Sequence, residues 1–581
     1  MSPALHLRSL CALSLALICG WAVAQHRAPE AASGWQDRAA VTARHWMVAA
    51  ANPLAASAGD DVLAHGGNAI DAAVAVQLVL NVVEPQSSGI GGGAFLLYHD
   101  AAHRSLTAYD GRETAPAAAT PERFLGPDGK PLAFYRAVIG GRAVGVPGTV
   151  ALLYETHRRH GRMPWRKLFE HAIRLCEHGF PVSPRLATLL ATDAHVTDER
   201  TRAAFSRPDG TLLREGDVLV NAALGATLRS IALSGPGAFY HGAIAQDIVD
   251  TVRSHSANPG DITLADLAAY RVKVRKPVCG PYRAYVVCGM PLPSSGGMTV
   301  LQMLAMLEPY DIAAMGPATF WSVHFMSEAG RLAYADRDMY MADPDFYAAP
   351  TGLLDPTYLA RRSRSIATDR SLGSAQAGTP EQVRAAQVVA ANEALAFAST
   401  SHVSIVDAQG NAVALTTTIE DAFGSRLMTR SGFLLNNELT DFSFVPHRDG
   451  KPVANRVQGG KRPRSSMSPT IVYDRAGRLF MIAGSPGGAA IINYVVKALL
   501  AVIDWKLDPQ AATALPNFGS LNGPTELEQD TSAASLAEKL RANGHDVRIA
   551  PHTSGLHLIV RTHNGWMGGA DPRREGVARG Q

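Results

Sequence analysis

One threonine stands at the start of a β-rich stretch, directly after a long segment with little periodicity. Thr400 opens residues 400–407, and the residues before it are rich in Ala, Ser, Gln and Arg. A threonine hydroxyl is a poor nucleophile at its free pKa and must lie beside a base. A free α-amino group titrates at roughly 7.7–8.0, so a terminal threonine carries a base within reach of its own Oγ. We therefore interpret Thr400 as a nucleophile that cleavage of the Ser399–Thr400 bond exposes.

The segments on either side of Thr400 bear on this interpretation. Residues 363–399 offer at most a short helix near residues 381–391, which favours an exposed, flexible linker before the cleavage point. Residues 402–407 and 411–419 are β-branched runs joined by Ala-Gln-Gly, which predicts a hairpin. Threonine is common in strands, so these residues taken alone favour the plainer interpretation that Thr400 simply begins one.

The composition is that of a globular protein with an export signal. The chain has 581 residues, of which 47% are hydrophobic and 18% charged, and its net charge of +3 gives no electrostatic argument for nucleic acid. Length alone suggests about four domains, a soft expectation that the motifs described below override in favour of one catalytic unit. Residues 1–24 contain Arg8, an apolar run over residues 10–18 and Ala-Val-Ala before Gln25, which predicts a secretory signal peptide. We expect a periplasmic or secreted protein without a membrane anchor.

The mature chain keeps three cysteines, which is too few for a disulfide framework. Cys279 and Cys288 could pair in an oxidising compartment or remain two ordinary buried thiols. His171, Cys176 and His178 lie close in sequence but lack a fourth ligand, so we predict no metal there. No other cluster has metal spacing.

The first part of the chain predicts two helices, a glycine loop and a hairpin. The helices are expected over residues 54–64 and 69–83, and the second is too short and too polar to span a bilayer, which takes about 20 apolar residues. Residues 89–94 fit a dinucleotide-binding pattern, but they follow a helix and precede a strand, the reverse of the required order. We therefore interpret these glycines as sites of close backbone packing.

The rest of the chain alternates hairpins with helical pairs, which favours an α+β fold. We expect helices over residues 148–161, 164–179, 298–307 and 489–504, and β structure over residues 272–290, 471–473, 479–483, 558–561 and 566–567. The sequence Gly-Ser-Pro-Gly-Gly ends at Gly488, directly before a strongly apolar helix. Unpaired backbone N–H groups at such a helix start can stabilise a developing oxyanion.

Several stretches taken together resemble the γ-glutamyltranspeptidase family. They are residues 66–73, 84–85 with the glycine loop, 110–116, 400–407, 434–443, 464–469 and 484–488. The resemblance runs from about residue 47 to residue 573. It implies an N-terminal-nucleophile hydrolase fold, a four-layer αββα sandwich, formed by self-cleavage into a large subunit (residues 25–399) and a small subunit (residues 400–581) that stay intertwined as a heterodimer.

The resemblance also implies roles for individual residues. Thr400 matches the nucleophile, Thr418 the residue that hydrogen-bonds near the new amino terminus, and Arg112 the arginine that grips the substrate α-carboxylate. The other matched positions are Ser465 and Ser466 for the same carboxylate, Glu420, Glu438 and Asp441 for the α-ammonium, and Gly487 and Gly488 as oxyanion donors. Two features depart from the family pattern: some members have Asn where Glu420 stands, and the loop over residues 444–464 is short and contains no tyrosine that could close over the substrate.

The expected activity is γ-glutamyl transfer and hydrolysis, with glutathione or a related compound as donor. Water, an amino acid or a dipeptide would accept the acyl group, and no cofactor is required. A second hypothesis is an acylase that acts on glutaryl or cephalosporin-type side chains with the same fold. A third is a binding protein that is never processed.

Overall fold

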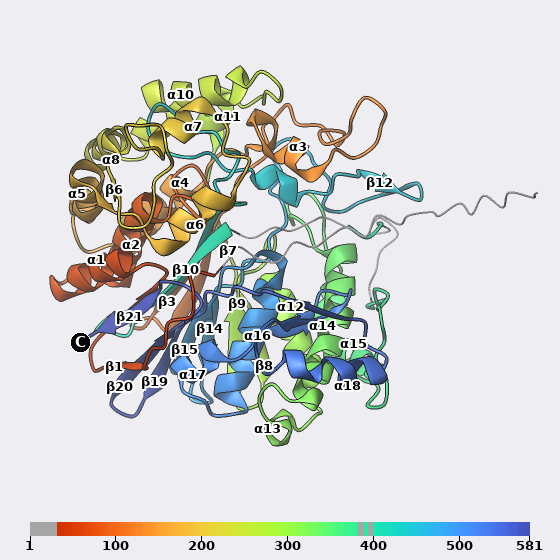
Figure 1. Cartoon of the computed structure of the whole chain (residues 1–581). Helices are drawn as coiled ribbons and strands as arrows, with labels where there is room; N and C mark the ends of the chain where they lie inside the picture. Colours follow the sequence, from red (N-terminus) through yellow and green to blue (C-terminus); the bar gives the residue numbers. More distant parts are fainter. Residues whose placement is uncertain (1–31, 382–388, 393–398) are drawn as a thin grey trace, which may run out of the picture.

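The computed structural model describes residues 32–381, 389–392 and 399–581 (Figure 1). The predicted signal peptide and most of the short helix expected near residues 381–391 lie outside the described residues. Two seven-stranded sheets lie face to face, and helices cover the outer face of each. This arrangement is the α+β, four-layer αββα sandwich that the sequence predicts.

The first sheet carries the hairpin that begins at the predicted cleavage point. Its strand order is β21 (Val577–Gly580), β2 (Met47–Ala50), β10 (Ser399–Val406), β11 (Ala412–Glu420), β3 (Gly93–Asp100), β4 (Ser105–Gly111) and β7 (Lys273–Arg275). Every residue of β10 and β11 is buried, because both faces of these central strands are covered. The two strands form the hairpin predicted from their β-branched runs.

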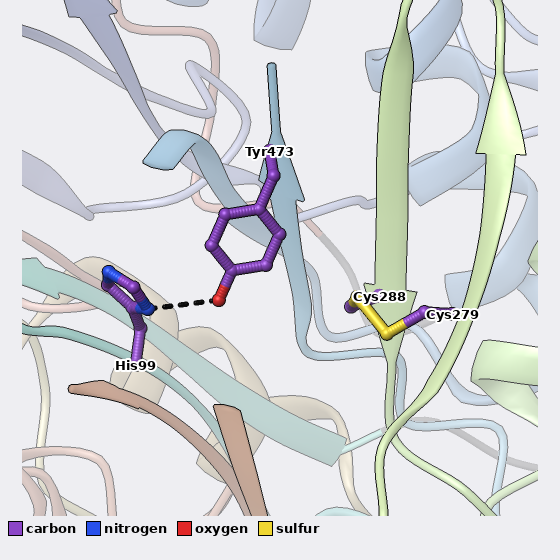
Figure 2. The surroundings of a disulfide bond; sticks show 4 residues. All are labelled: His99, Cys279, Cys288 and Tyr473. Atoms are coloured by element: carbon purple, nitrogen blue, oxygen red, sulfur yellow. Dashed lines mark hydrogen bonds between the residues drawn. A yellow bond between two sulfur atoms is a disulfide. The ribbon is translucent and has the colours of Figure 1, made fainter. Parts of the chain in front are cut away.

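The second sheet lies against the first and carries one disulfide. Its order is β1 (Val41–Ala43), β20 (Gly565–Ala570), β19 (His557–Thr562), β15 (Leu479–Gly484), β14 (Thr470–Tyr473), β9 (Tyr285–Gly289) and β8 (Val278–Tyr282). Cys279 and Cys288 are directly opposite each other on β8 and β9 and form a disulfide (Figure 2). The same view shows Tyr473 Oη 3.0 Å from His99 Nδ1, a polar contact that joins the two sheets.

Helices cover the two outer faces. The helices α1 (Pro53–Ala64), α2 (Ala69–Val83) and α4 (Thr149–His160) pack on the first sheet, and α5 (Glu170–His178) packs on α2. The helices α12 (Gly296–Leu307), α16 (Ile491–Ile503) and α17 (Pro509–Ala514) pack on the second sheet, and α14 (Phe320–Tyr340) packs on α12. All residues of α2 are buried, as its apolar sequence predicts. Within the described residues, none of the helices combines the length and apolarity needed to cross a membrane.

The remaining α-helices and β-strands of the described residues complete the fold. They are α3 (Phe134–Val138), α6 (Pro184–Thr192), α7 (Glu199–Ala204), α8 (Ala222–Ser234), α9 (Gly237–Tyr240), α10 (Gly242–Ser254), α11 (Leu264–Ala269), α13 (Ile312–Met315), α15 (Pro356–Ser363), α18 (Ala537–Ala542), β5 (Phe180–Pro181), β6 (Val218–Leu219), β12 (His447–Arg448), β13 (Lys451–Pro452), β16 (Phe518–Ser520), β17 (Thr525–Glu528) and β18 (Val547–Ala550). The helix expected over residues 164–179 begins as a separate 3₁₀ turn, Trp165–Phe169, before α5.

The glycine loop between α2 and β3 packs closely against the hairpin. A Cβ atom on Gly91 would lie 2.1 Å from the Leu434 carbonyl oxygen, and one on Gly92 would lie 2.0 Å from that of Thr418. No larger residue fits at these positions without moving the neighbouring backbone. The structure therefore confirms that these glycines serve close packing, and Gly92 lies directly against the backbone of Thr418.

Candidate active site

Thr400 lies near the start of β10, where one neighbouring strand has already ended. Strand β2 pairs with β10 only over Val403–Val406, so the first residues of β10 extend past it. On the other side Thr400 pairs with Thr418, while Ser399 pairs with Glu420. This register leaves Ile419 as an extra residue opposite the Ser399–Thr400 bond. Bulges of this kind redirect side chains and are frequent beside active sites.

The hydroxyl of Thr418 connects the two residues of the predicted cleavage point. It donates a hydrogen bond to the Ser399 carbonyl oxygen, with an O···O distance of 2.7 Å. It accepts one from the hydroxyl of Thr400 at 3.3 Å and another from the backbone N–H of Glu420 at 2.8 Å. Because its own proton is committed to Ser399, Thr418 polarises that carbonyl and orients the Thr400 hydroxyl at the same time.

A pocket opens beside Thr400, and both predicted subunits contribute to it. Its lining residues are Arg112, Thr400, Thr418, Glu420, Glu438, Asp441, Ser465, Ser466, Met467, Gly488 and Ile491. All predicted site residues except Gly487 therefore line one pocket. Met467 and Ile491, which were not among the predicted site residues, add apolar wall; Met467 lies within the motif over residues 464–469, and Ile491 comes three residues after Gly488.

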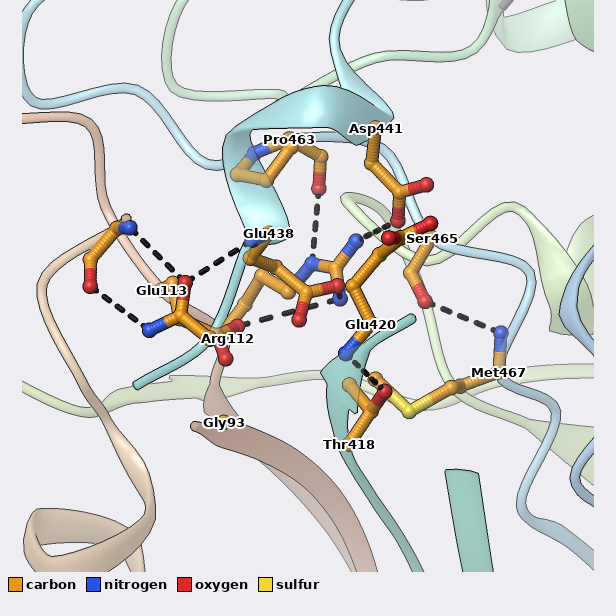
Figure 3. A network of polar contacts seen from close by, with 12 residues as sticks. Gly93, Arg112, Glu113, Thr418, Glu420, Glu438, Asp441, Pro463, Ser465 and Met467 are labelled. Atoms are coloured by element: carbon orange, nitrogen blue, oxygen red, sulfur yellow. Dashed lines mark hydrogen bonds and ion pairs between the residues drawn. The ribbon is translucent and has the colours of Figure 1, made fainter. Parts of the chain in front are cut away.

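Arg112 is buried at the end of β4, and almost all of its donors are engaged (Figure 3). Nε donates to the Pro463 carbonyl and Nη2 to the Arg464 carbonyl, each at 3.1 Å. Nη1 also contacts the carboxyl group of Glu438, and Nη2 that of Asp441. Four of the five N–H donors thus have partners among the described residues. A two-pronged grip on a substrate carboxylate therefore requires Glu438 or Asp441 to release Arg112.

The pocket holds more buried acids than cations. Besides Glu438 and Asp441, the guanidinium of Arg112 has Glu113 Oε2 3.9 Å from Nη1, and Glu420 also lines the pocket. Burial, together with the neighbouring acids, raises the pKa of Glu420 and Glu438 well above the ordinary carboxyl range. Burial raises the pKa of Glu113 to about 7, although Arg112 opposes this shift. A positively charged ligand would allow more of these groups to ionise.

Glu420 is held in an uncommon backbone conformation. Its φ angle is 81°, in the left-handed region that a residue with a Cβ atom rarely adopts. The bond from its N–H to Thr418 and the contact of its carboxyl group with Asn437 Nδ2 keep it there. Its other oxygen, Oε1, is buried and has no hydrogen-bond partner among the described residues. The side chain is thus fixed with one acceptor available to a ligand.

Ser465 and Ser466 are arranged as hydrogen-bond donors. The hydroxyl oxygen of Ser465 accepts from the Met467 N–H at 3.1 Å, and that of Ser466 accepts from Arg337 Nη2 at 2.6 Å. Neither hydroxyl donates its proton to another residue of the described part of the chain. Two buried hydroxyl groups that each accept one hydrogen bond and keep an available proton suit an anionic group such as a carboxylate.

Gly487 and Gly488 precede α16 in left-handed conformations. Their φ angles are 134° and 55°, and a Cβ atom on Gly487 would lie 2.5 Å from the Tyr494 ring. Gly488 lines the pocket and begins a 3₁₀ turn that leads into α16. The oxyanion role of both residues stays a prediction.

The loop over residues 444–464, which contains no tyrosine, folds onto the protein. Its strands β12 and β13 pair as a small hairpin, and the ring of Phe444 stacks on Phe124 with 4.6 Å between centroids. Asn455 Nδ2 donates to the Asp441 carbonyl at 2.7 Å, which ties the loop to the wall of the pocket.

A histidine cluster that sequence reasoning overlooked lies away from this pocket. His324, Glu328 and His545 are buried within ligand range of one another, although the sequence analysis found no second cluster with metal spacing. The available signal was the i, i+4 spacing of His324 and Glu328 on α14. His324 Nε2 donates to the Ala367 carbonyl and Nδ1 lies 2.8 Å from His545 Nε2. With Thr525 beside His545 Nδ1, the ring nitrogens already have protein partners.

The four-layer sandwich, with a threonine near the start of a central strand beside a polar pocket, defines an N-terminal-nucleophile hydrolase fold. The family model described as gamma-glutamyltranspeptidase matches residues 55–581. The chain therefore belongs to the γ-glutamyltranspeptidase family, as its sequence motifs predict.

Similar proteins cover nearly the whole chain. The glutathione hydrolase proenzyme of Bacillus subtilis (strain 168) is 37% identical over 543 residues, which cover 92% of this chain and 91% of that protein. The crystal structure of a cephalosporin acylase from Bacillus halodurans superposes with a TM-score of 0.81 at 28% identity, covering 94% of this chain and 97% of that one. The Helicobacter pylori γ-glutamyltranspeptidase gives a TM-score of 0.53 at 34% identity, covering 61% of this chain and 97% of that one.

Proposed function

We propose that this protein hydrolyses and transfers γ-glutamyl groups from glutathione and related compounds after self-cleavage before Thr400. The observation that carries this proposal is the pocket beside Thr400, which offers two serine hydroxyl protons and an excess of buried carboxyl groups. A γ-glutamyl group carries an α-carboxylate, which can accept the serine hydroxyl protons, and an α-ammonium, which can pair with the buried carboxyl groups. The similarity to proteins named glutathione hydrolase supports the same assignment.

Maturation is proposed as an N-to-O acyl shift. Thr400 Oγ1 attacks the Ser399 carbonyl carbon, the C–N bond breaks, and the nitrogen takes up a proton. Thr418 donates to the oxygen on which negative charge develops. Water then hydrolyses the Ser399 ester, which leaves a carboxylate on Ser399 and a free α-amino group on Thr400. In the precursor that nitrogen is an amide, so water or a neighbouring side chain must take the hydroxyl proton.

Turnover follows the same chemistry on an external amide. The new α-amino group accepts the proton of Thr400 Oγ1 while the oxygen attacks the γ-carbonyl of the donor. The C–N bond breaks, the amine leaves with a proton, and a γ-glutamyl ester remains on Thr400. Water or the amine of an amino acid or dipeptide resolves this ester. We assign the oxyanion contacts to Gly487 and Gly488.

The two cleaved chains are expected to stay together as a heterodimer. In the first sheet β10 and β11 belong to the proposed small subunit, while their neighbours β2 and β3 belong to the large one. Separation would expose both edges of a buried hairpin, which is unfavourable. We further propose that the mature protein is exported to the periplasm or secreted.

A release assay tests the proposed activity. Purified protein is incubated with a chromogenic γ-glutamyl anilide, with and without a dipeptide acceptor, and its subunits are separated by denaturing electrophoresis. Two chains together with anilide hydrolysis are the expected result, and faster release with the dipeptide would show transfer. A processed protein that leaves the γ-glutamyl anilide intact would contradict the proposal.

The similarity to a cephalosporin acylase favours one alternative, an acylase that acts on glutaryl-type side chains. A glutaryl anilide in the same assay distinguishes the two, because a glutaryl group has the carboxylate but no amine. An unprocessed binding protein, the third hypothesis, would give a single chain and no release.

Replacing Thr418 by Val is expected to slow maturation by roughly a hundredfold or more, because it removes the donor to the Ser399 carbonyl at nearly constant volume. The rate at which two chains appear after synthesis measures this effect. Thr417→Val is the matched control: the neighbouring hydroxyl contacts the Gly93 carbonyl at 3.4 Å rather than the cleavage point. Equal maturation rates in the two variants would remove Thr418 from the reaction.

Replacing Arg112 by Lys is expected to reduce kcat/KM for the γ-glutamyl anilide by roughly tenfold to a hundredfold while maturation proceeds. A lysine keeps the charge but cannot reproduce the planar set of donors, and each lost charge-assisted hydrogen bond costs about 1.5–3 kcal/mol. Steady-state kinetics on fully processed protein measures the effect. An unchanged kcat/KM would show that Arg112 does not contact the substrate.

A further inference from the structure

Arg337, near the end of α14, lies behind both serines of the pocket and belongs to none of the motifs that resemble the family. Its Nη2 donates to Ser466 Oγ at 2.6 Å and its Nε to Ser295 Oγ at 2.9 Å. Ser295 in turn donates from its hydroxyl and from its N–H to the Ser465 carbonyl, at 2.7 and 2.8 Å. The buried guanidinium of Arg337 thus holds the Ser466 hydroxyl directly, and it holds the Ser465 backbone through Ser295.

The charge of Arg337 is only partly compensated by the groups around it. Asp338 Oδ1 lies 2.8 Å from Arg337 Nη1 and 2.9 Å from Arg464 Nη2, so one carboxylate faces two guanidinium groups. Burial lowers the pKa of Arg464 to about 10, and the proximity of Arg337 acts in the same direction. Tyr334, whose ring lies 5.4 Å from the Arg337 guanidinium carbon, adds no formal charge.

The excess of positive charge around Arg337 contrasts with the surroundings of Arg112, which lines the pocket. There one guanidinium faces three carboxyl groups, those of Glu438, Asp441 and Glu113, so its positive charge already has partners. Four donors of Arg112 are already engaged, as described above. A substrate carboxylate therefore meets uncompensated positive charge mainly at Ser465 and Ser466, where Arg337 stands behind the hydroxyl groups.

We propose that Arg337 is the positioning residue that makes Ser465 and Ser466 selective for a carboxylate, and so sets the preference for donors with a free α-carboxylate. The inference rests on the proposed γ-glutamyl activity and extends it to a residue outside the pocket lining. A guanidinium that donates to the Ser466 oxygen leaves the hydroxyl proton to the ligand and strengthens it as a donor. The contact also crosses the predicted cleavage, because Arg337 lies in the large subunit and Ser466 in the small one.

The test compares three anilides that differ only at the α-carbon: γ-glutamyl, 4-aminobutanoyl, which lacks the carboxylate, and glutaryl, which lacks the amine. In Arg337→Gln, KM for the γ-glutamyl and glutaryl compounds is expected to rise on the order of tenfold to a hundredfold. Their kcat should change less, and kcat/KM for the 4-aminobutanoyl compound should stay within about twofold of the parent. Inhibition by L-glutamate and by 4-aminobutanoate provides the same comparison without turnover.

Three further substitutions separate positioning from general stability. Arg362→Gln removes another guanidinium packed on α14, which contacts the Leu332 carbonyl and Asp336 rather than the pocket, and it should affect all three substrates within about twofold. Ser466→Ala should cost much less in the Arg337→Gln background than alone, because the two groups act as one unit. Arg337→Lys keeps the charge, and its KM for the γ-glutamyl and glutaryl anilides should lie between the values of the parent and of Arg337→Gln.

Each outcome supports or overturns the inference. Selective loss on the two carboxylate-bearing substrates supports it. Equal loss on all three substrates, or failure of both Arg337 variants to mature, would show that Arg337 serves folding alone. No loss on any substrate would show that Arg337 does not act on the substrate carboxylate. If the parent itself cleaves none of the three anilides, the proposed function fails and the inference fails with it, which is a different result from an active parent with an unselective variant.

Discussion

Thr400→Ala is expected to yield a single uncleaved chain with no measurable γ-glutamyl activity. The same hydroxyl serves in both proposed steps, so its loss removes the attack on Ser399 and the attack on the donor. Loss of a nucleophile in other hydrolases lowers turnover by roughly a millionfold, which lies below the detection limit of the anilide assay. Mass spectrometry of the purified variant measures maturation, and the anilide assay measures activity.

Thr400→Ser is the matched variant, because it keeps the hydroxyl and removes only a methyl group. It should still mature and turn over, since Ser also provides an attacking oxygen within reach of Thr418. Both variants should fold alike, because Thr400 is buried and, within the described residues, its side chain hydrogen-bonds only to Thr418. Efficient formation of a fragment that begins at residue 400 in Thr400→Ala would show that another group cleaves the chain.

The part of the fold that local sequence rules describe is the part that was predicted well. The hairpin of β10 and β11 follows from two β-branched runs and a Gly-containing turn, and the buried helix α2 from an unbroken apolar run. The close packing of Gly91 and Gly92 follows from the order of helix, loop and strand around them. In each case neighbours in the sequence carry the information.

The contacts of the site could not be predicted this way. Arg112 Nε donates to the carbonyl of Pro463, which is 351 residues away in the chain, and no local pattern encodes that approach. The resemblance to a family brought Arg112, Glu438 and Ser466 to one pocket, but not the engagement of Arg112 by the acids. Arg337 was missed because nothing in its spacing indicates that it lies behind Ser466.

Glu113 was missed for a different reason. It follows Arg112 directly, and an acid beside an arginine in a turn is usually a solvated pair. The structure buries both side chains completely, and desolvation then moves the pKa of Glu113 to about 7. The sequence does not show that the residues after this strand are buried. Because they are buried, Arg112 and Glu113 are part of the charge balance of the pocket and are not a solvated pair.

That charge balance leads to the second large expected effect, a strong preference for γ-glutamyl over glutaryl anilides. A glutaryl group brings a carboxylate but no cation, so Glu420, Glu438 and Asp441 would remain short of a positive partner around it. An ammonium group on the substrate can pair with Glu420 Oε1 and the neighbouring acids through charge-assisted hydrogen bonds, each of which contributes about 1.5–3 kcal/mol. A glutaryl group forms none of these bonds, and the loss of two of them corresponds to a preference on the order of a thousandfold in kcat/KM.

Asp441→Asn tests this account, because it removes one negative charge at nearly constant shape. The variant should lower kcat/KM for the γ-glutamyl anilide and leave the glutaryl value unchanged or higher, so that the ratio between them narrows by roughly tenfold or more. Asp441 also contacts Arg112, so the substitution frees an Arg112 N–H donor for the substrate carboxylate. This change should also raise kcat/KM for the glutaryl anilide. The measurement is the ratio of kcat/KM for the two anilides in parent and variant. If the parent already hydrolyses the glutaryl compound as well as the γ-glutamyl one, these acids do not recognise an amine, and the acylase becomes the better assignment.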